Sequence, residues 1–117
     1  MGVEAALIIL RCRDPLGDTV VLHDHQWSFH VLEHPELAGQ LAAVKLAIEA
    51  PDRIVTDRDR ADRRCYYRAE VLPAPYDEDL LKVVVGLATG SQGTTTGEVI
   101  TAYATPRVKQ GEAQQWP

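Results

Sequence analysis

The feature that most constrains the fold is a nine-residue run at residues 80–88, which is apolar except for Lys82 and Gly86. Apolar side chains at successive positions fill both faces of a strand, so this run predicts a strand at the centre of a sheet. Three further segments have strand character, at residues 53–56, 64–71 and 98–105. These four segments are close enough in the sequence to pair as an antiparallel meander.

The segment at residues 64–71 alternates between two kinds of side chain. Cys65, Tyr67, Ala69 and Val71 share one face of the predicted strand by the two-residue period of strands. The other face carries two guanidinium groups, a phenol and a carboxylate, from Arg64, Tyr66, Arg68 and Glu70. We expect this second face to be polar and open to a ligand.

The N-terminal part of the chain predicts a hairpin followed by a short helix. Two runs of branched apolar residues, 3–12 and 19–23, flank a turn-forming segment. Residues 25–34 lose the strict alternation of a strand, and Asp24 is a suitable N-cap for a helix there. This helix should end before Pro35, because proline disfavours helical geometry in the residue that precedes it.

A second helix is predicted over residues 36–50. Pro35 suits the first position of a helix, and Pro51 follows its expected end. Apolar residues recur at helical spacing and form one stripe: Leu37, Leu41, Val44 and Ile48. The chain as a whole therefore predicts an α+β fold, with an N-terminal β-hairpin and two helices packed on one face of an antiparallel meander sheet, for which parallel crossovers are not needed. We expect one domain over residues 1–117.

Composition narrows the class of protein. The chain is 45% hydrophobic and 25% charged, with a net charge of -5, which excludes a strong nonspecific nucleic-acid binder. The longest apolar run near the N-terminus, residues 5–10, is too short to span a membrane and has no basic lead-in. Cys12 and Cys65 lie 53 positions apart without a CxxC spacing. We therefore expect a cytoplasmic protein without a membrane partner, and a Cys12–Cys65 disulfide is the alternative to two free thiols.

Positive charge is concentrated in one segment. Residues 53–68 hold six of the 12 basic residues, opposed by only three aspartates. Two interpretations are open: a solvated loop whose Arg and Asp side chains pair with each other, or an edge that faces phosphate groups.

Four histidines lie within residues 23–34, and His30 and His34 are one helical turn apart. Two imidazoles can deliver and remove protons at a phosphodiester. In the alternative interpretation, His34 only caps the second helix beside Pro35, and His30 is a hydrogen-bonded residue at the edge of the core. A zinc site that adds His23 or His25 is a third interpretation, but no complete ligand pattern is present, so we expect no metal and no cofactor.

A set of short motifs resembles a known family. The motifs, in chain order, are Trp27-x-x-His30, His34-Pro35-Glu36-Leu37, Pro51-Asp52-x-Ile54-x-x-Asp57, Tyr66-Tyr67, Val83-Val84-Val85, Val99-Ile100-Thr101-Ala102-Tyr103, Gly111-Glu112 and Trp116-Pro117. Together, over residues 14–117, they resemble the barnase/EndoU/colicin/RelE-like nucleases, in particular the phage-associated branch. That architecture, helices followed by a four-stranded antiparallel meander, agrees with the one predicted from periodicity.

The resemblance implies a small metal-independent ribonuclease, often a toxin, with RNA as substrate and a protein inhibitor as partner. The implied catalytic residues lie on the first helix, the first long strand and the last strand: His30, Arg64 or Arg68, Thr101 and Tyr103. In the chemistry we expect, His30 is the base, His34 or Tyr103 donates a proton, and Arg68 balances charge. RNA contacts are expected from Arg64, Tyr66 and Lys109. The competing hypothesis is an inactive interaction or structural module in which Trp27, Tyr66 and Trp116 bind a partner or pack.

Overall fold

The computed structural model describes residues 7–117 and contains two α-helices, one 3-10 helix and seven strands. The N-terminal half comprises β1 (Ile8–Arg13), β2 (Thr19–His23), α1 (Asp24–Glu33), η1 (Pro35–Leu37) and α2 (Leu41–Glu49). The C-terminal half comprises β3 (Arg53–Thr56), β4 (Arg63–Ala69), β5 (Leu80–Thr89), β6 (Thr95–Thr105) and β7 (Ala113–Trp116). The predicted α+β class and the N-terminal hairpin are confirmed, although the first positions of the predicted first strand, 3–6, lie outside the described residues.

All seven strands form one sheet in the order β1-β2-β6-β5-β4-β3-β7. The predicted central strand is confirmed, since β5 has three strands on either side. β3 to β6 form the predicted antiparallel meander. The prediction of a purely antiparallel sheet is wrong, because β2 pairs with β6 in parallel. The short strand β7 was not predicted, and it pairs with β3 at the sheet edge.

The parallel pairing between β2 and β6 is short, and the helical segment that follows β2 covers the rest of the β6 edge. β2 contacts only the first part of β6, residues 96–98, and α1 starts directly after β2. Side chains of α1 and of η1 then make hydrogen bonds with the remainder of β6, where no neighbouring strand is present. The Gln26 amide donates to the Ile100 carbonyl oxygen (3.3 Å), and the Ala104 N–H donates to the Glu36 carboxylate (3.2 Å). The edge of β6 is thereby protected, and the end of α1 is held beside β6.

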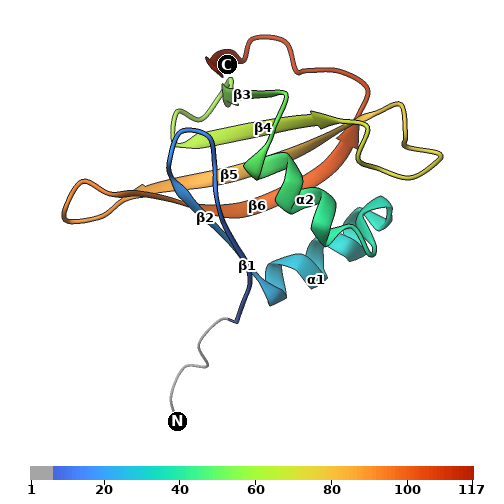
Figure 1. The fold of residues 1–117 in the computed structure, drawn as a ribbon, viewed down its shortest axis with the longest axis horizontal. Helices are drawn as coiled ribbons and strands as arrows, with labels where there is room; N and C mark the ends of the chain where they lie inside the picture. The colour runs from blue at the N-terminus through green and yellow to red at the C-terminus, as the bar shows by residue number, and fades with distance from the viewer. Residues whose placement is uncertain (1–6) are drawn as a thin grey trace.

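Both helices lie on one face of the sheet, where the main core forms (Figure 1). The predicted helix over 36–50 is interrupted: the 3-10 turn and α2 are separate, and Gly39 between them has a φ of +75°. Three members of the predicted stripe are fully buried, namely Leu37, Val44 and Ile48. Leu41 is only partly buried, because it is the first residue of α2. Asp24 is not an N-cap but the first residue of α1, after His23.

The prediction of an open polar face on β4 is wrong. Tyr66 is fully buried on the helix-covered face, and the Arg64 side chain is 10% exposed. Arg64 donates to the carboxylates of Asp14 and Asp18, both at 2.8 Å, and the Tyr66 hydroxyl donates to Asp14. Arg64 and Tyr66 are therefore bound by carboxylates of the β1–β2 turn, which two-residue periodicity cannot show.

The two cysteines lie on opposite faces of the sheet, Cys12 in the main core and Cys65 in a smaller cluster with Val55, Tyr67 and Val84. Both thiols are free and buried, so the disulfide alternative is not present in the structure.

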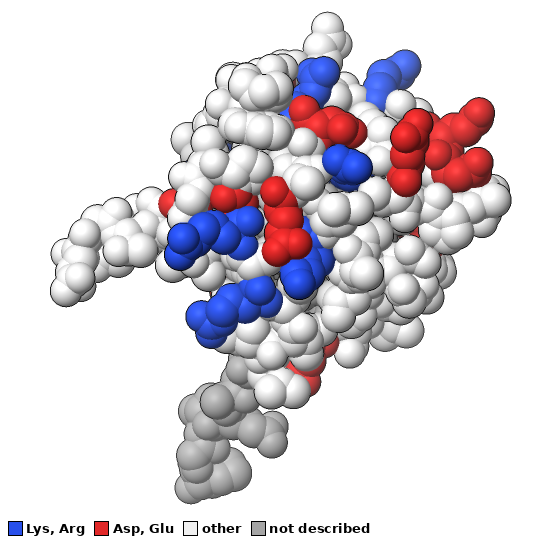
Figure 2. Space-filling view, viewed as in Figure 1, with Lys and Arg blue, Asp and Glu red and all other residues white. Residues whose placement is uncertain are grey.

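Charge is mixed on the face that carries the helices. Figure 2 shows Lys and Arg interspersed with Asp and Glu there, and acidic side chains gather at the end of the molecule near the β4–β5 connection. Of the basic segment, Arg58 pairs with Asp59 and Arg60 pairs with Asp62. These local pairs favour the solvated-loop interpretation for this part of the segment. Within residues 7–117, neither α1 nor α2 is long and apolar enough to cross a membrane.

Candidate functional site

The face of the sheet opposite the helices holds a row of polar side chains at its centre. The strand register places Tyr67 of β4, Lys82 of β5 and Tyr103 of β6 next to one another. The Lys82 ammonium lies 5.2 Å from the centre of the Tyr67 ring and 5.9 Å from that of Tyr103. Paired residues on adjacent strands point to the same face, so this row results directly from the meander.

The segment between β6 and β7 folds over this row and closes a pocket of about 700 Å³. The lining consists of Arg58, Tyr67, Lys82, Tyr103 and residues 105–110. All of the charged side chains in the lining are cations: Arg58, Lys82, Arg107 and Lys109. Arg58 and Lys109 each lie within ion-pair distance of Asp59, so a carboxylate beside the pocket compensates part of this positive charge.

A buried ion pair lies behind the pocket. The Lys82 ammonium is 3.1 Å from one carboxylate oxygen of Glu112, and the two side chains are 4% and 0% exposed. The Tyr67 hydroxyl donates to the other oxygen of Glu112 and accepts a hydrogen bond from the Lys109 N–H (3.2 Å). Burial alone lowers the pKa of Lys82, but the hydrogen bonds with Tyr67 and Glu112 outweigh it and raise the pKa above its ordinary value. Lys82 is therefore charged.

His34 lies beside the same row, at the C-terminal end of α1. Its ring stacks on the Tyr103 ring, with centres 5.5 Å apart and planes inclined by 27°. Its Nδ1 is 3.6 Å from a Glu36 carboxylate oxygen, and the imidazole is 33% exposed. His34 and Tyr103, the two alternative proton donors of the expected chemistry, thus lie next to each other, with a carboxylate on one side of the imidazole.

His30, the predicted base, has a different environment. It is 7% exposed, and neither ring nitrogen has a hydrogen-bond partner in residues 7–117. Burial lowers the pKa of its imidazole, and the nearby His34 acts in the same direction, whereas Glu33 opposes both. His30 does not line the pocket. Its burial agrees with the alternative interpretation, in which His30 is a hydrogen-bonded residue at the edge of the core, but the hydrogen bonds expected there are not formed within the described residues.

The lowered pKa of His30 predicts a loss of stability on acidification. The unfolded chain binds the proton at a higher pH than the folded chain, so this stability is present above about pH 6.5 and is lost as the pH falls below it. We expect the unfolding free energy of the wild type, measured in urea, to fall more between about pH 7 and about pH 5 than that of His30→Met. His25→Met, at an exposed position of α1, should keep the wild-type pH dependence. If acidification lowered the unfolding free energy of His30→Met and of the wild type equally, the conclusion that the His30 imidazole is buried and neutral would be contradicted.

The structure separates the other predicted site residues. Thr101 is on the pocket side of β6 but does not line the pocket, whereas Lys109 does. Arg68 lies on the opposite face, where its guanidinium donates to the Ala50 carbonyl oxygen (2.8 Å) at the end of α2. The expected convergence of Arg68 with Thr101 and Tyr103 is therefore wrong. Arg64 and Tyr66 are also excluded from this pocket, because both are buried on the helix-covered face.

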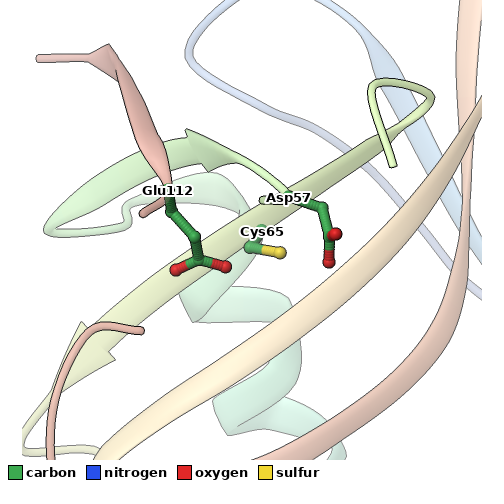
Figure 3. Close-up of side chains that lie close together, drawn as sticks. All are labelled: Asp57, Cys65 and Glu112. Carbon is green, nitrogen blue, oxygen red and sulfur yellow. The ribbon is translucent and has the colours of Figure 1, made fainter. Parts of the chain in front are cut away.

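Asp57, Cys65 and Glu112 also come together beneath the segment before β7 (Figure 3). One potential ligand atom from each lies within 4.8 Å of the others. Their groups are already engaged: Glu112 binds Lys82 and Tyr67, and Asp57 accepts hydrogen bonds from two backbone N–H groups. Burial raises the pKa of the Cys65 thiol to about 12. Glu112 thus belongs to the buried polar network, whereas Asp57 is only partly buried and its two hydrogen bonds are exposed. The cluster contains neither His23 nor His25.

Sequence reasoning missed Tyr67, Lys82 and Glu112 as members of one site. The available signal was Lys82, the single charge in the apolar run that predicts the central strand. A charged residue on a central strand requires a partner, but its identity depends on how the chain folds back after β6. Comparison with protein-family models, with curated proteins and with solved structures finds no match for this chain.

Proposed function

We propose that the protein is a metal-independent endoribonuclease whose site is the pocket on the open face of the sheet. The observation that carries the proposal is the stacking of His34 on Tyr103: Tyr103 lines a pocket whose charged lining residues are all cations, and His34 lies beside that pocket without lining it. An imidazole can move the proton of a ribose hydroxyl, and the cations can bind the adjacent phosphate.

The proposed reaction needs only groups of this site. The 2'-oxygen of a ribose attacks the neighbouring phosphorus, the bond from phosphorus to the 5'-oxygen breaks, and a 2',3'-cyclic phosphate forms. His34 accepts the proton of the 2'-hydroxyl, and the Glu36 carboxylate stands opposite the positive charge that the ring then acquires. Tyr103 donates a proton to the departing 5'-oxygen, and Lys82 stabilises the negative charge on the phosphate.

Incubation of the purified protein with RNA in the presence of EDTA tests this proposal. We expect cleavage with EDTA present, products that end in a cyclic phosphate, and no cleavage of DNA of the same sequence, because DNA lacks the nucleophile. Any bound protein inhibitor is removed first by unfolding and refolding. RNA that stays intact under all these conditions would contradict the proposal.

RNA binding should weaken as salt rises, and the pocket cations should account for part of that dependence. We expect Arg107→Ala/Lys109→Ala to reduce the slope of log K against log salt by about 0.7 for each phosphate contact that is lost. Binding is measured by fluorescence anisotropy with a single-stranded RNA whose reacting 2'-hydroxyl is replaced by hydrogen. Arg11→Ala, on the edge strand β1, is the matched control and should keep the wild-type slope. A double variant with that same slope would argue against phosphate binding in the pocket.

The competing hypothesis, an interaction module without activity, depended on three aromatic residues. Tyr66 is fully buried, and Trp27 and Trp116 are partly buried against the main core. These residues therefore pack against the core, which is the second of the two roles that this hypothesis gives them. The RNA cleavage test distinguishes an inactive interaction or structural module from the proposed ribonuclease.

A further inference from the structure

The Lys82–Glu112 pair is almost fully buried, as is the neighbouring Tyr67, and the fold alone does not require an ion pair at this position. Neighbouring positions on the same face, Val55 and Val84, are filled by apolar side chains. Apolar residues at buried positions are often as stabilising as an ion pair, because two charges must otherwise be removed from water. The ion pair therefore suggests a functional role, and Lys82 is the member of the pair that lines the pocket.

Only one of the two charged side chains of this pair is in contact with the pocket. Lys82 lines the pocket, between the two tyrosine rings, whereas Glu112 does not line it. Glu112 reaches Lys82 from the segment that closes the pocket, and the preceding Gly111 has a φ of +90°, which other residues rarely adopt. A Cβ atom at Gly111 would lie 2.7 Å from Cδ of Arg58. The backbone at this point is thus shaped to turn the Glu112 side chain inward.

We propose that Glu112 is a positioning residue, which holds the Lys82 ammonium and the Tyr67 hydroxyl beneath the place where the scissile phosphate binds. This inference rests on the proposed function. With one carboxylate oxygen on Lys82 and the other on Tyr67, Glu112 fixes both groups before substrate arrives. A group that is fixed in advance stabilises the charge that develops in the transition state without reorganisation.

The consequence for kinetics is a separation of kcat from KM. Glu112 does not line the pocket and should contribute little to substrate binding, so Glu112→Gln should lower kcat at least tenfold with little change in KM. Glu112→Asp keeps the charge with a shorter reach and should recover part of kcat. Glu98→Gln, a carboxylate that pairs with His23 away from the pocket, is the matched control and should keep the wild-type kcat.

A second measurement does not depend on RNA cleavage. Burial first, and then the hydrogen bond to Glu112, raise the pKa of Tyr67 to about 12. In Glu112→Gln the Lys82 charge remains and the carboxylate charge is lost, so this pKa should fall, as followed by ultraviolet absorbance of the phenolate. Subtraction of the titration of Glu112→Gln/Tyr67→Phe assigns the change to Tyr67.

The two measurements separate the possible failures. If the wild type cleaves RNA and Glu112→Gln cleaves it with an unchanged kcat per folded molecule, the positioning role is overturned and the proposed function stands. If the wild type does not cleave RNA, the proposed function fails and the catalytic role of Glu112 fails with it. An unchanged Tyr67 titration in Glu112→Gln would overturn the hydrogen-bonded arrangement itself.

The folded fraction of each variant is measured by circular dichroism. The double variant Lys82→Met/Glu112→Gln leaves no unpaired buried charge, so it should fold and should also lose kcat.

Discussion

His34→Ala should lower the rate of EDTA-resistant RNA cleavage by at least about a hundredfold, the lower end of what a positioned acid or base contributes. The imidazole is 33% exposed and stacks on Tyr103, so its removal takes away the proposed proton acceptor without opening a deep cavity. The variant should therefore remain folded. Single-turnover cleavage of a short labelled RNA measures the rate, and circular dichroism confirms the fold.

Acidification should have the same effect as the substitution. A protonated imidazole cannot accept the proton of the 2'-hydroxyl. We expect the wild-type rate to fall as the pH is lowered and the residual rate of His34→Ala to lose that dependence.

His25→Ala is the control for both measurements, because His25 lies on the same helix with a side chain that is 63% exposed. It should keep the wild-type rate and pH profile. A His34→Ala rate equal to that of the wild type would exclude His34 as the base, and the same loss in His30→Ala alone would restore the original assignment.

The fold was predictable where a local pattern determines it. The apolar run at 80–88 identified β5, and turn-forming residues bounded the strands next to it. The parallel pairing of β2 with β6 was not predictable, because it depends on which edge of the sheet the first hairpin joins. Long-range packing determines that edge, and the local sequence does not show it. β7 was missed for a similar reason: its four residues have no apolar alternation and depend on β3 for pairing.

The candidate site was only partly predictable. Tyr103 and Lys109 were identified and lie at the pocket, and His34 lies against Tyr103. The arginines were not placed correctly, because periodicity tells which residues share a face but not which face the helices cover. Arg68 is an example: its guanidinium binds the C-terminal end of α2, where a cation is favourable next to free carbonyl groups.

The largest expected effect on stability comes from Asp14, in the turn between β1 and β2. Asp14→Ala should lower the unfolding free energy by about 3 to 5 kcal/mol, the usual cost of removing one partner from a buried ion pair. The Asp14 side chain is 0% exposed and accepts hydrogen bonds from Arg64, Tyr66 and two backbone N–H groups. Its loss leaves the Arg64 guanidinium with only Asp18 and leaves the Tyr66 hydroxyl without an acceptor inside the core.

Unfolding in urea, followed by tryptophan fluorescence, measures this change. Asp59→Ala is the control: that carboxylate also pairs with an arginine, but it is 64% exposed, and exposed pairs contribute about 1 kcal/mol or less. The triple variant Asp14→Leu/Arg64→Met/Tyr66→Phe removes the three buried polar side chains together and should recover part of the stability, because no buried guanidinium or hydroxyl is then left without a partner. Recovery should be incomplete, because two backbone N–H groups still lose the Asp14 carboxylate and Asp18 loses Arg64. If Asp14→Ala is no less stable than Asp59→Ala, the turn does not hold the polar groups of β4, and the open polar face predicted from the alternation of residues 64–71 would have to be reconsidered.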